Sequence, residues 1–385
     1  MLCFLMGRTF VSWTANLLLL TISIATVLGI CEVGFRVRAH WRNQQTWAHA
    51  FESLPAPPTK RPSTLVHLIQ PSLHPHVIYE LRPNLSTRYN YDSTVRINEH
   101  GFRGPSYPQQ KSPGTFRILG LGDSSMFGNG VSEGEPYPHR LMAMLRQWRP
   151  ERGWEFINTA APGYNTVMEV AMLEHKGLSF EPDLILIDFV PNDMSLPNFI
   201  RVDERPWGLH KSFLWEYAAG ALATVPSLAH LPGRREPVGL EALDPGLIVA
   251  VQDGQYERNP DKVPAQYRYM VGFDAYSTAM RRLAEIGDEH GIPILRMDSL
   301  PMYGFGSEKL AVASLAPAQE SGMHVLDLRP AVEDAARKSG YDNFRESPLG
   351  FGKRDSHLSA LGHEVVAKGL FEHLTQTGLV PGGLP

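Results

Sequence analysis

The residues of this chain best suited to chemistry are a serine, a histidine and an aspartate. Ser124 stands in Gly-Asp-Ser-Ser directly after an apolar run, and Asp355-Ser-His357 lies near the C-terminus. A serine hydroxyl becomes a good nucleophile when an imidazole removes its proton, and a carboxylate orients that imidazole and stabilises its charged form. These residue types predict nucleophilic chemistry, with Ser124 as nucleophile, His357 as base and Asp355 as acid.

Gly163 and Asn192 supply the hydrogen-bond donors that such chemistry needs. Gly163 follows a second apolar run, and Asn192 follows a third. A tetrahedral intermediate carries negative charge on oxygen, which preorganised donors stabilise. We expect the backbone N–H groups of Ser124 and Gly163 and the side-chain amide of Asn192 to serve as these donors. Taken singly, a turn glycine, a capping asparagine and a loop histidine are simpler explanations; the ordered set favours a site.

Strands and helices alternate through the region that carries these residues. Compact apolar runs predict strands at 116–121, 154–158, 183–190, 292–297 and 323–328. Helical spacing of apolar residues predicts helices at 135–148, 166–178 and 273–290, with a further helix at the C-terminus. This alternation predicts an α/β fold with a parallel, doubly wound sheet. The carboxyl ends of parallel strands meet at one edge, so Ser124, Gly163 and Asn192 should converge there, within reach of a C-terminal loop.

The N-terminal segment predicts a transmembrane helix. Thr9 to Cys31 contains 23 residues without a charged side chain, and a helix of that length is about 35 Å long, enough to cross a bilayer. A cleaved signal peptide is disfavoured because no small-x-small site follows the apolar run. A lipoprotein site at Cys31 is disfavoured because Ile30 occupies a position that requires a small residue. We therefore expect an uncleaved, single-pass anchor over residues 1–40.

The orientation of this anchor has two opposing indications. Arg8 precedes the apolar run, whereas Arg36, Arg38 and Arg42 follow it. Counted alone, these charges place the remainder of the chain in the cytoplasm. The same rule weakens where a large folded domain follows the helix, so the charges leave the orientation open.

Other regions lie outside the alternation of strands and helices. Residues 41–75 are rich in proline and polar residues and predict a linker. Residues 76–112 contain short strand-like runs and turns, which predict a small β extension. Residues 195–264 interrupt the alternation and predict an insertion that caps the strand ends, with a helical patch at 213–229.

The bulk composition excludes several kinds of partner. The 385 residues carry a formal net charge of −4, so nothing indicates a nucleic-acid-binding surface. The two cysteines, Cys3 and Cys31, are both near the N-terminus. The remainder of the chain therefore has no disulfide, no thiolate-ligated metal and no cysteine nucleophile.

Four sequence blocks resemble those of the SGNH (GDSL-type) esterase/lipase superfamily over about residues 116–373. They are Gly122-Asp123-Ser124, Asn158…Gly163, Asn192-Asp193 and Asp355…His357. The resemblance implies a flavodoxin-like three-layer α/β/α sandwich over 113–378, with Ser124 as nucleophile, Gly163 and Asn192 as oxyanion donors, and Asp355 with His357 completing a triad. One residue separates the acid from the base, where the commonest pattern has two. In an extended loop, residues two apart point the same way, so Asp355 remains our expected acid.

The segment 95–104, together with the anchor, is similar to a membrane-tethered bacterial branch of that superfamily, which implies a catalytic domain outside the cytoplasm, periplasmic or at the cell surface. We expect a serine esterase or acylhydrolase without metal or cofactor, acting on an acylated small molecule, lipid or polysaccharide. An O-acyltransferase would use the same site, and a membrane-anchored binding or assembly protein is the non-catalytic alternative. Arg103 is a candidate for reaching the cleft, although a role in its turn is simpler.

Overall fold

The computed structural model describes residues 2–50, 54–201, 207, 212–222, 240–242, 248–251, 257–301, 307–352 and 355–382. The chain divides into two compact units. One contains the N-terminal helix and a short helix from the predicted insertion. The other contains the parallel sheet and all five predicted site residues.

The first unit is built on helix α1, Leu2–Ala50. Its segment Ala15–Trp41 has a mean hydropathy of 2.2 over its most apolar window and is long and apolar enough to cross a membrane. Helix α6, Phe213–Leu222, packs on α1 within this unit. The Glu32 carboxylate of α1 accepts hydrogen bonds from the backbone N–H groups of Phe213 and Leu214, at 3.1 and 2.8 Å. The first turn of α6 is therefore capped by a side chain from α1.

A five-stranded parallel sheet forms the centre of the second unit. Its strands lie in the order β12-β11-β7-β5-β6, all neighbours being parallel. In chain order the arrangement is 2-1-3-4-5, the flavodoxin-like order, which confirms the predicted fold class. The strands are β5 Thr115–Leu121, β6 Gly153–Asn158, β7 Leu184–Asp188, β11 Ile294–Asp298 and β12 His324–Asp327.

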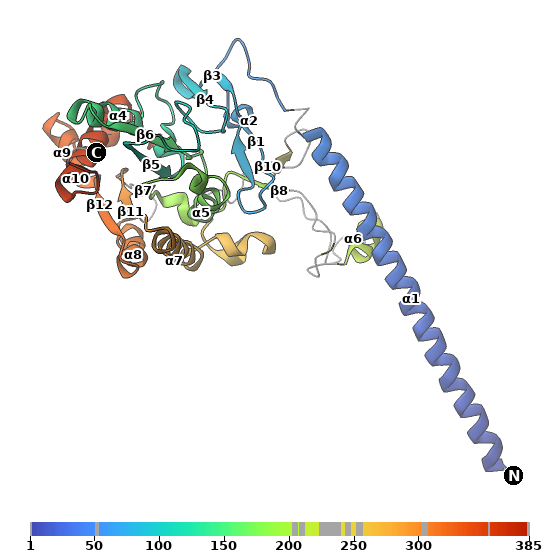
Figure 1. Ribbon diagram of the computed structural model, residues 1–385. Helices are drawn as coiled ribbons and strands as arrows, with labels where there is room; N and C mark the ends of the chain where they lie inside the picture. Colours follow the sequence, from blue (N-terminus) through green and yellow to red (C-terminus); the bar gives the residue numbers. More distant parts are fainter. Residues whose placement is uncertain are drawn as a thin grey trace. The chain divides into compact units, whose positions relative to one another are not determined.

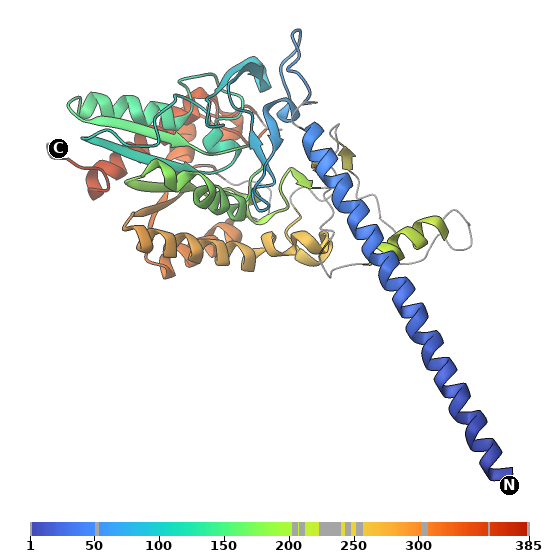
Figure 2. The ribbon, with the colours of Figure 1, turned by 45° about the vertical axis from the view of Figure 1, so that its right-hand side comes forward.

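Helices cover both faces of this sheet (Figures 1 and 2). On one face α10 packs against α4 and α9, and on the other α7 packs against α5 and α8. Helix α4 packs its buried apolar stripe, which includes Leu141 and Leu145, against the sheet at β6. The three-layer α/β/α sandwich is thus confirmed. The bounds are α4 Tyr137–Trp148, α5 Thr166–His175, α7 Phe273–His290, α8 Ser307–Glu320, α9 Arg329–Lys338 and α10 Ala360–Thr377.

Two antiparallel strand pairs precede the parallel sheet in the chain, and three of their four strands lie within the predicted β extension, 76–112. Strand β1 (Ile69–Pro71) pairs with β2 (Tyr79–Leu81), and β3 (Leu85–Tyr89) pairs with β4 (Ser93–Ile97). A short 3₁₀ turn, η1 (Asn90–Asp92), connects β3 to β4.

The linker predicted over residues 41–75 is wrong at both ends. Helix α1 continues to Ala50, and α2 (Leu65–Leu68) leads into β1 with Leu68 and Ile69 buried. The prolines at 55–58 dominated the composition of this window. They obscured the apolar run Leu-Val-His-Leu-Ile that begins at Leu65.

The described part of the predicted insertion holds a three-stranded antiparallel sheet, in the order β8-β10-β9. The strands are β8 Phe199–Arg201, β9 Leu240–Ala242 and β10 Ile248–Val251. Helix α6 lies within the predicted helical patch, whose remainder, 223–229, is outside the described residues.

Candidate active site

Ser124 is displayed at the carboxyl end of the central strand β5. It is the first residue of the one-turn helix α3 (Ser124–Phe127), which is capped by Asp123 through a 2.9 Å hydrogen bond from the Ser125 N–H to Oδ1. Gly122 permits this tight exit from the strand, because a Cβ there would lie 2.9 Å from the Met126 Cβ. As the first helical residue, Ser124 has a backbone N–H without an intrahelical acceptor. Its hydroxyl and its N–H are thus both presented at the sheet edge.

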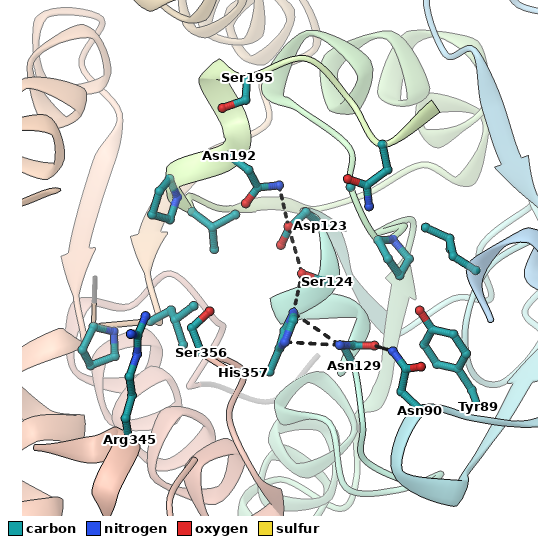
Figure 3. A pocket seen from close by; sticks show the side chains of 18 of the residues that line it. Tyr89, Asn90, Asp123, Ser124, Asn129, Asn192, Ser195, Arg345, Ser356 and His357 are labelled. Atoms are coloured by element: carbon teal, nitrogen blue, oxygen red, sulfur yellow. Dashed lines mark hydrogen bonds between the residues drawn. The ribbon is translucent and has the colours of Figure 1, made fainter. Parts of the chain in front are cut away.

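Asp355 and His357 come from a loop before α10 and meet Ser124 at that edge. The Ser124 Oγ lies 2.8 Å from the His357 Nε2 (Figure 3), and the His357 Nδ1 lies 2.6 Å from the Asp355 Oδ1. The same carboxylate oxygen accepts the backbone N–H of His357 at 2.9 Å. With one residue between them, Asp355 therefore binds both the ring and the main chain of His357. The Nδ1–H tautomer leaves Nε2 free to accept the serine proton.

The surroundings of Asp355 favour its charged form. Its half-buried position opposes ionisation, but hydrogen bonds from His357 and Tyr91 outweigh this and hold the pKa of the carboxyl well below its usual range. The group is therefore a carboxylate throughout the neutral pH range. That is the charge state required to stabilise an imidazolium.

Gly163 and Asn192 reach the same place from the ends of β6 and β7. Gly163 has φ +81°, and a Cβ there would lie 2.3 Å from the Asn198 side chain, so the position requires glycine. The Asn192 amide donates to Asp123 Oδ2 at 2.9 Å and to the Tyr164 carbonyl at 3.4 Å. Ser124 Oγ also lies 3.0 Å from that Asp123 oxygen. Asp123 thus joins the nucleophile loop to the Asn192 loop, besides its capping role.

Four of the five predicted site residues line one pocket, and the fifth contacts it through the histidine. It has a volume of about 300 Å³ and is lined by Ser124, Gly163, Asn192 and His357, with Asp355 behind the imidazole. Its walls mix apolar side chains with amides, hydroxyls and guanidinium groups, among them Leu65, Val190, Leu300, Asn198, Arg258 and Arg345. Figure 3 shows the histidine ring between Ser124 and Asn129 in this pocket. The pocket is large enough for a small acyl group and part of its alcohol.

Three residues that the sequence prediction missed support the base and the acid. Asn129 places its amide nitrogen 3.2 Å from His357 Nδ1, and its oxygen accepts a 2.9 Å hydrogen bond from Asn90. Tyr91 donates its hydroxyl proton to Asp355 Oδ2 at 2.6 Å. All three stand in turns rich in polar residues, where the sequence offers no signal that separates them from ordinary turn formers.

Arg103 does not reach the pocket. It is fully buried and donates to the carbonyl oxygens of Phe127, Gly128 and Val131, each at 2.7 Å. Of the two roles considered for it, the structural one is correct. Its guanidinium fixes the loop that carries Asn129.

A set of carboxyl groups is buried beneath the nucleophile. Burial raises the pKa of Asp188 to about 7, although hydrogen bonds from Ser299 and Tyr137 partly oppose it. Burial also raises the pKa of Glu169 and Asp193 well above the usual range, and their mutual proximity adds to the effect on Asp193. These groups favour the neutral form, in contrast to Asp355. Asp193 is thus a buried group that accepts the backbone N–H of Val190 within its own turn.

The fold and the site define this chain as a flavodoxin-like α/β protein with a serine, a histidine and an aspartate in hydrogen-bond contact at the end of its central strand. Among the residues that the structure describes, no three histidine, cysteine, aspartate or glutamate side chains are grouped to hold a metal ion.

Comparisons with known proteins gave structural neighbours only. No family model matches the chain, and no curated protein matches it. Among solved structures, a protein assigned to the G-D-S-L family of lipolytic proteins from Desulfitobacterium hafniense DCB-2 is similar at a TM-score of 0.39 and 12% identity, over 66% of this chain and 98% of that one. The acetyl xylan esterase Axe2 from Geobacillus stearothermophilus, as its W215I variant, gives 0.40 and 16% over 71% and 98%.

A third structure, the α/β hydrolase LAE5 from the metagenome of Lake Arreo, gives a TM-score of 0.39 and 14% identity, over 70% of this chain and 98% of that one. The first of these neighbours bears the same family name as the four sequence blocks. Similarity at this level does not assign an activity to this chain.

Proposed function

We propose that this chain is a serine esterase or acylhydrolase that cleaves O-acyl esters through an acyl-enzyme on Ser124. The observation that carries the proposal is the line of short contacts from Ser124 through His357 to Asp355, 2.8 and 2.6 Å long, beside a pocket open to a substrate. A nucleophile, a base and an orienting acid within hydrogen-bond reach are the signature of nucleophilic acyl transfer.

In the first half-reaction, Ser124 Oγ attacks the acyl carbonyl carbon while its proton passes to His357 Nε2. The carbonyl electrons move onto oxygen, where the N–H groups of Ser124 and Gly163 and the amide of Asn192 receive the charge. The 3.4 Å contact of Asn192 to the Tyr164 carbonyl is the weaker of its two and is the one an oxyanion would replace. The intermediate then collapses, the C–O bond to the alcohol breaks, and the imidazolium returns the proton to the leaving oxygen.

In the second half-reaction, a water molecule enters on the side that the alcohol has left. His357 takes one of its protons, the resulting oxygen nucleophile attacks the acyl carbon, and the free acid leaves Ser124 with its hydroxyl restored. Asp355 balances the imidazolium charge in both halves. An O-acyltransferase would differ only in that an acceptor hydroxyl replaces this water.

The cellular setting of this activity is a further part of the proposal. The length and hydropathy of Ala15–Trp41 support a single membrane-spanning anchor. We place the catalytic unit outside the cytoplasm, where acylated lipids or polysaccharides would be its substrates. Reporter fusions after residue 50 test this orientation, and a cytoplasmic signal would reverse it.

The test of the activity uses the full chain in detergent with p-nitrophenyl acetate and a fluorophosphonate probe. Ser124→Ala and His357→Ala should each lower kcat by about 10⁴-fold or more, and Ser124→Ala should abolish labelling. Ser321→Ala and His290→Ala, at positions away from the pocket, are the matched controls. Equal rates in all five proteins and no labelling would leave a binding protein as the better description. Transfer of acetyl to an added sugar in preference to water would identify an acyltransferase.

A further inference from the structure

The turn between β3 and β4 makes an unusual approach to the site. Tyr91 and Asp92 both have left-handed backbone conformations, with φ of 57° and 60°. Non-glycine residues adopt this conformation at a cost, and two in succession need support from their surroundings. The Tyr91 ring has such support, since it stacks on Phe351 with the ring centres 4.2 Å apart and the planes 9° from parallel.

This conformation directs the Tyr91 hydroxyl onto Asp355. The two oxygens of that carboxylate have separate partners: Oδ1 accepts the ring and main-chain N–H groups of His357, whereas Oδ2 accepts the Tyr91 hydroxyl at 2.6 Å. With both oxygens held, the carboxylate plane cannot rotate away from the imidazole. The loop carrying Asp355 therefore does not fix the acid alone.

The preceding residue of the same turn holds a side chain that lies against the imidazole. Asn90 donates to Asn129 at 2.9 Å, and the Asn129 amide nitrogen lies 3.2 Å from His357 Nδ1 and 3.4 Å from Nε2. Figure 3 shows Asn90 and Asn129 in line with the imidazole. One three-residue turn outside the α/β sandwich thus contacts the acid directly and the base through one intermediate.

We propose that the turn Asn90–Asp92 of the β extension is a positioning element of the catalytic site, in which Tyr91 fixes the orientation and charge distribution of Asp355. The inference deepens the proposed function and rests on it. Tyr91 touches no reacting atom, so it is a positioning residue that acts through the carboxylate. The β extension then completes the active site.

The chemistry of the hydroxyl fits this role. Its hydrogen bond to Asp355, with some burial, raises the pKa of Tyr91 to about 12, so it remains a proton donor at neutral pH. Among the described residues, the titratable groups that face Asp355 are His357 from its own loop and Tyr91 and Tyr89 from the β3–β4 hairpin. Loss of the Tyr91 donor leaves more negative charge on the oxygen that faces the imidazole.

The test is Tyr91→Phe, which removes the hydroxyl and retains the stacked ring. Because the carboxylate is then free to rotate away from the imidazole, we expect kcat to fall about tenfold with KM changed less than twofold. The acid limb of the pH profile of kcat/KM should move to higher pH, since a less neutralised carboxylate stabilises the charged imidazole more strongly. Tyr341→Phe, an exposed tyrosine on the same unit, is the control. An unchanged pH profile and rate in Tyr91→Phe would overturn the inference.

A double variant separates this inference from simple destabilisation. If Tyr91 acts through Asp355, then Tyr91→Phe should cost nothing further in an Asp355→Ala background, where its partner is absent, whereas additive losses would contradict it. The downfield proton signal of the His357 Nδ1–H gives a readout that needs no turnover, and it should shift in Tyr91→Phe. An unreactive wild type would refute the proposed function, and a signal unmoved by Tyr91→Phe would refute the positioning role.

Discussion

Replacement of Asp355 by asparagine is the sharpest test of the triad, because the structure predicts which way the new amide will face. The backbone N–H of His357 lies 2.9 Å from Oδ1 and requires an acceptor there. The amide oxygen should therefore occupy the Oδ1 position, and the NH₂ group should face Tyr91, whose hydroxyl can rotate to accept. In this orientation the Nδ1–H tautomer of His357 is retained, and what the variant loses is the negative charge.

The size of the loss follows from that charge. Two unit charges about 4 Å apart in a partly buried site interact by about 4 kcal/mol at an effective dielectric constant of 20. Since each 1.4 kcal/mol on the barrier is tenfold in rate, we expect kcat to fall about 10³-fold. If the amide instead turned its NH₂ to His357, the wrong tautomer would form and the loss would approach the 10⁴-fold seen in serine proteases.

The assay is the pH dependence of kcat and kcat/KM for p-nitrophenyl acetate, with Asp334→Asn as an exposed control on α9. A rate within tenfold of the wild type would show that the acid lies elsewhere and that the 2.6 Å contact has no catalytic role. A loss beyond 10⁴-fold, with activity recovering only at high pH, would show that the backbone N–H of His357 does not control the amide orientation.

Two further predictions concern the pocket and the groups beneath it. Asn192→Ala should lower kcat about 10²–10³-fold with little change in KM, because its amide is needed only when charge develops on the substrate oxygen; a change confined to KM would contradict this. Asp188, whose pKa burial raises from 3.8 to about 7, binds more protons when folded than unfolded, so it makes stability fall as pH rises from about 4 to about 7. In Asp188→Asn, the loss in free energy of unfolding between pH 5 and 8 should be smaller by roughly 2–3 kcal/mol. Urea unfolding of both proteins at several pH values measures this, and an equal loss in variant and wild type would contradict the prediction.

The five sheet strands were predictable because each is a short run of apolar residues bounded by turn formers. In β7 every residue is buried, and in β5 the last five residues are buried. Strands buried on both faces are continuous apolar runs, which are easy to recognise in the sequence. The convergence of Ser124, Gly163 and Asn192 follows from the parallel topology alone, since each stands at the carboxyl end of one strand. These predictions depend on local pattern and on one rule of sheet geometry.

The helices α8 and α9 were not predicted from the sequence. Helix α8 contains Pro317, which normally argues against a helix interior. Helix α9 buries only Val332 and Ala336, too few apolar positions for a clear period. Both helices depend on packing against the sandwich, which no local window of sequence contains.

The supporting contacts of the site were beyond sequence reasoning for a different reason. Tyr91 and Asp355 are 264 positions apart, and the contact depends on two left-handed backbone residues in a turn that nothing in the local sequence requires. The Asn90–Asn129 pair is likewise a juxtaposition of two ordinary turn residues. Patterns identify the reacting groups, since those must have particular chemistry, whereas groups that orient them need only be polar and well placed.

The contrast among the carboxyl groups near Ser124 supports Asp355 as the proposed acid. Asp188, Glu169 and Asp193 are buried within the sandwich, and their surroundings favour the neutral form. Asp355 is half-buried and receives three hydrogen bonds from two residues, which lower its pKa. An imidazolium needs a carboxylate that is charged before the reaction begins, and pKa values pushed apart by environment assign such roles. The unusual one-residue spacing in Asp355-Ser-His357 is therefore compatible with a working acid, because the β extension supplies the donor that the short loop cannot.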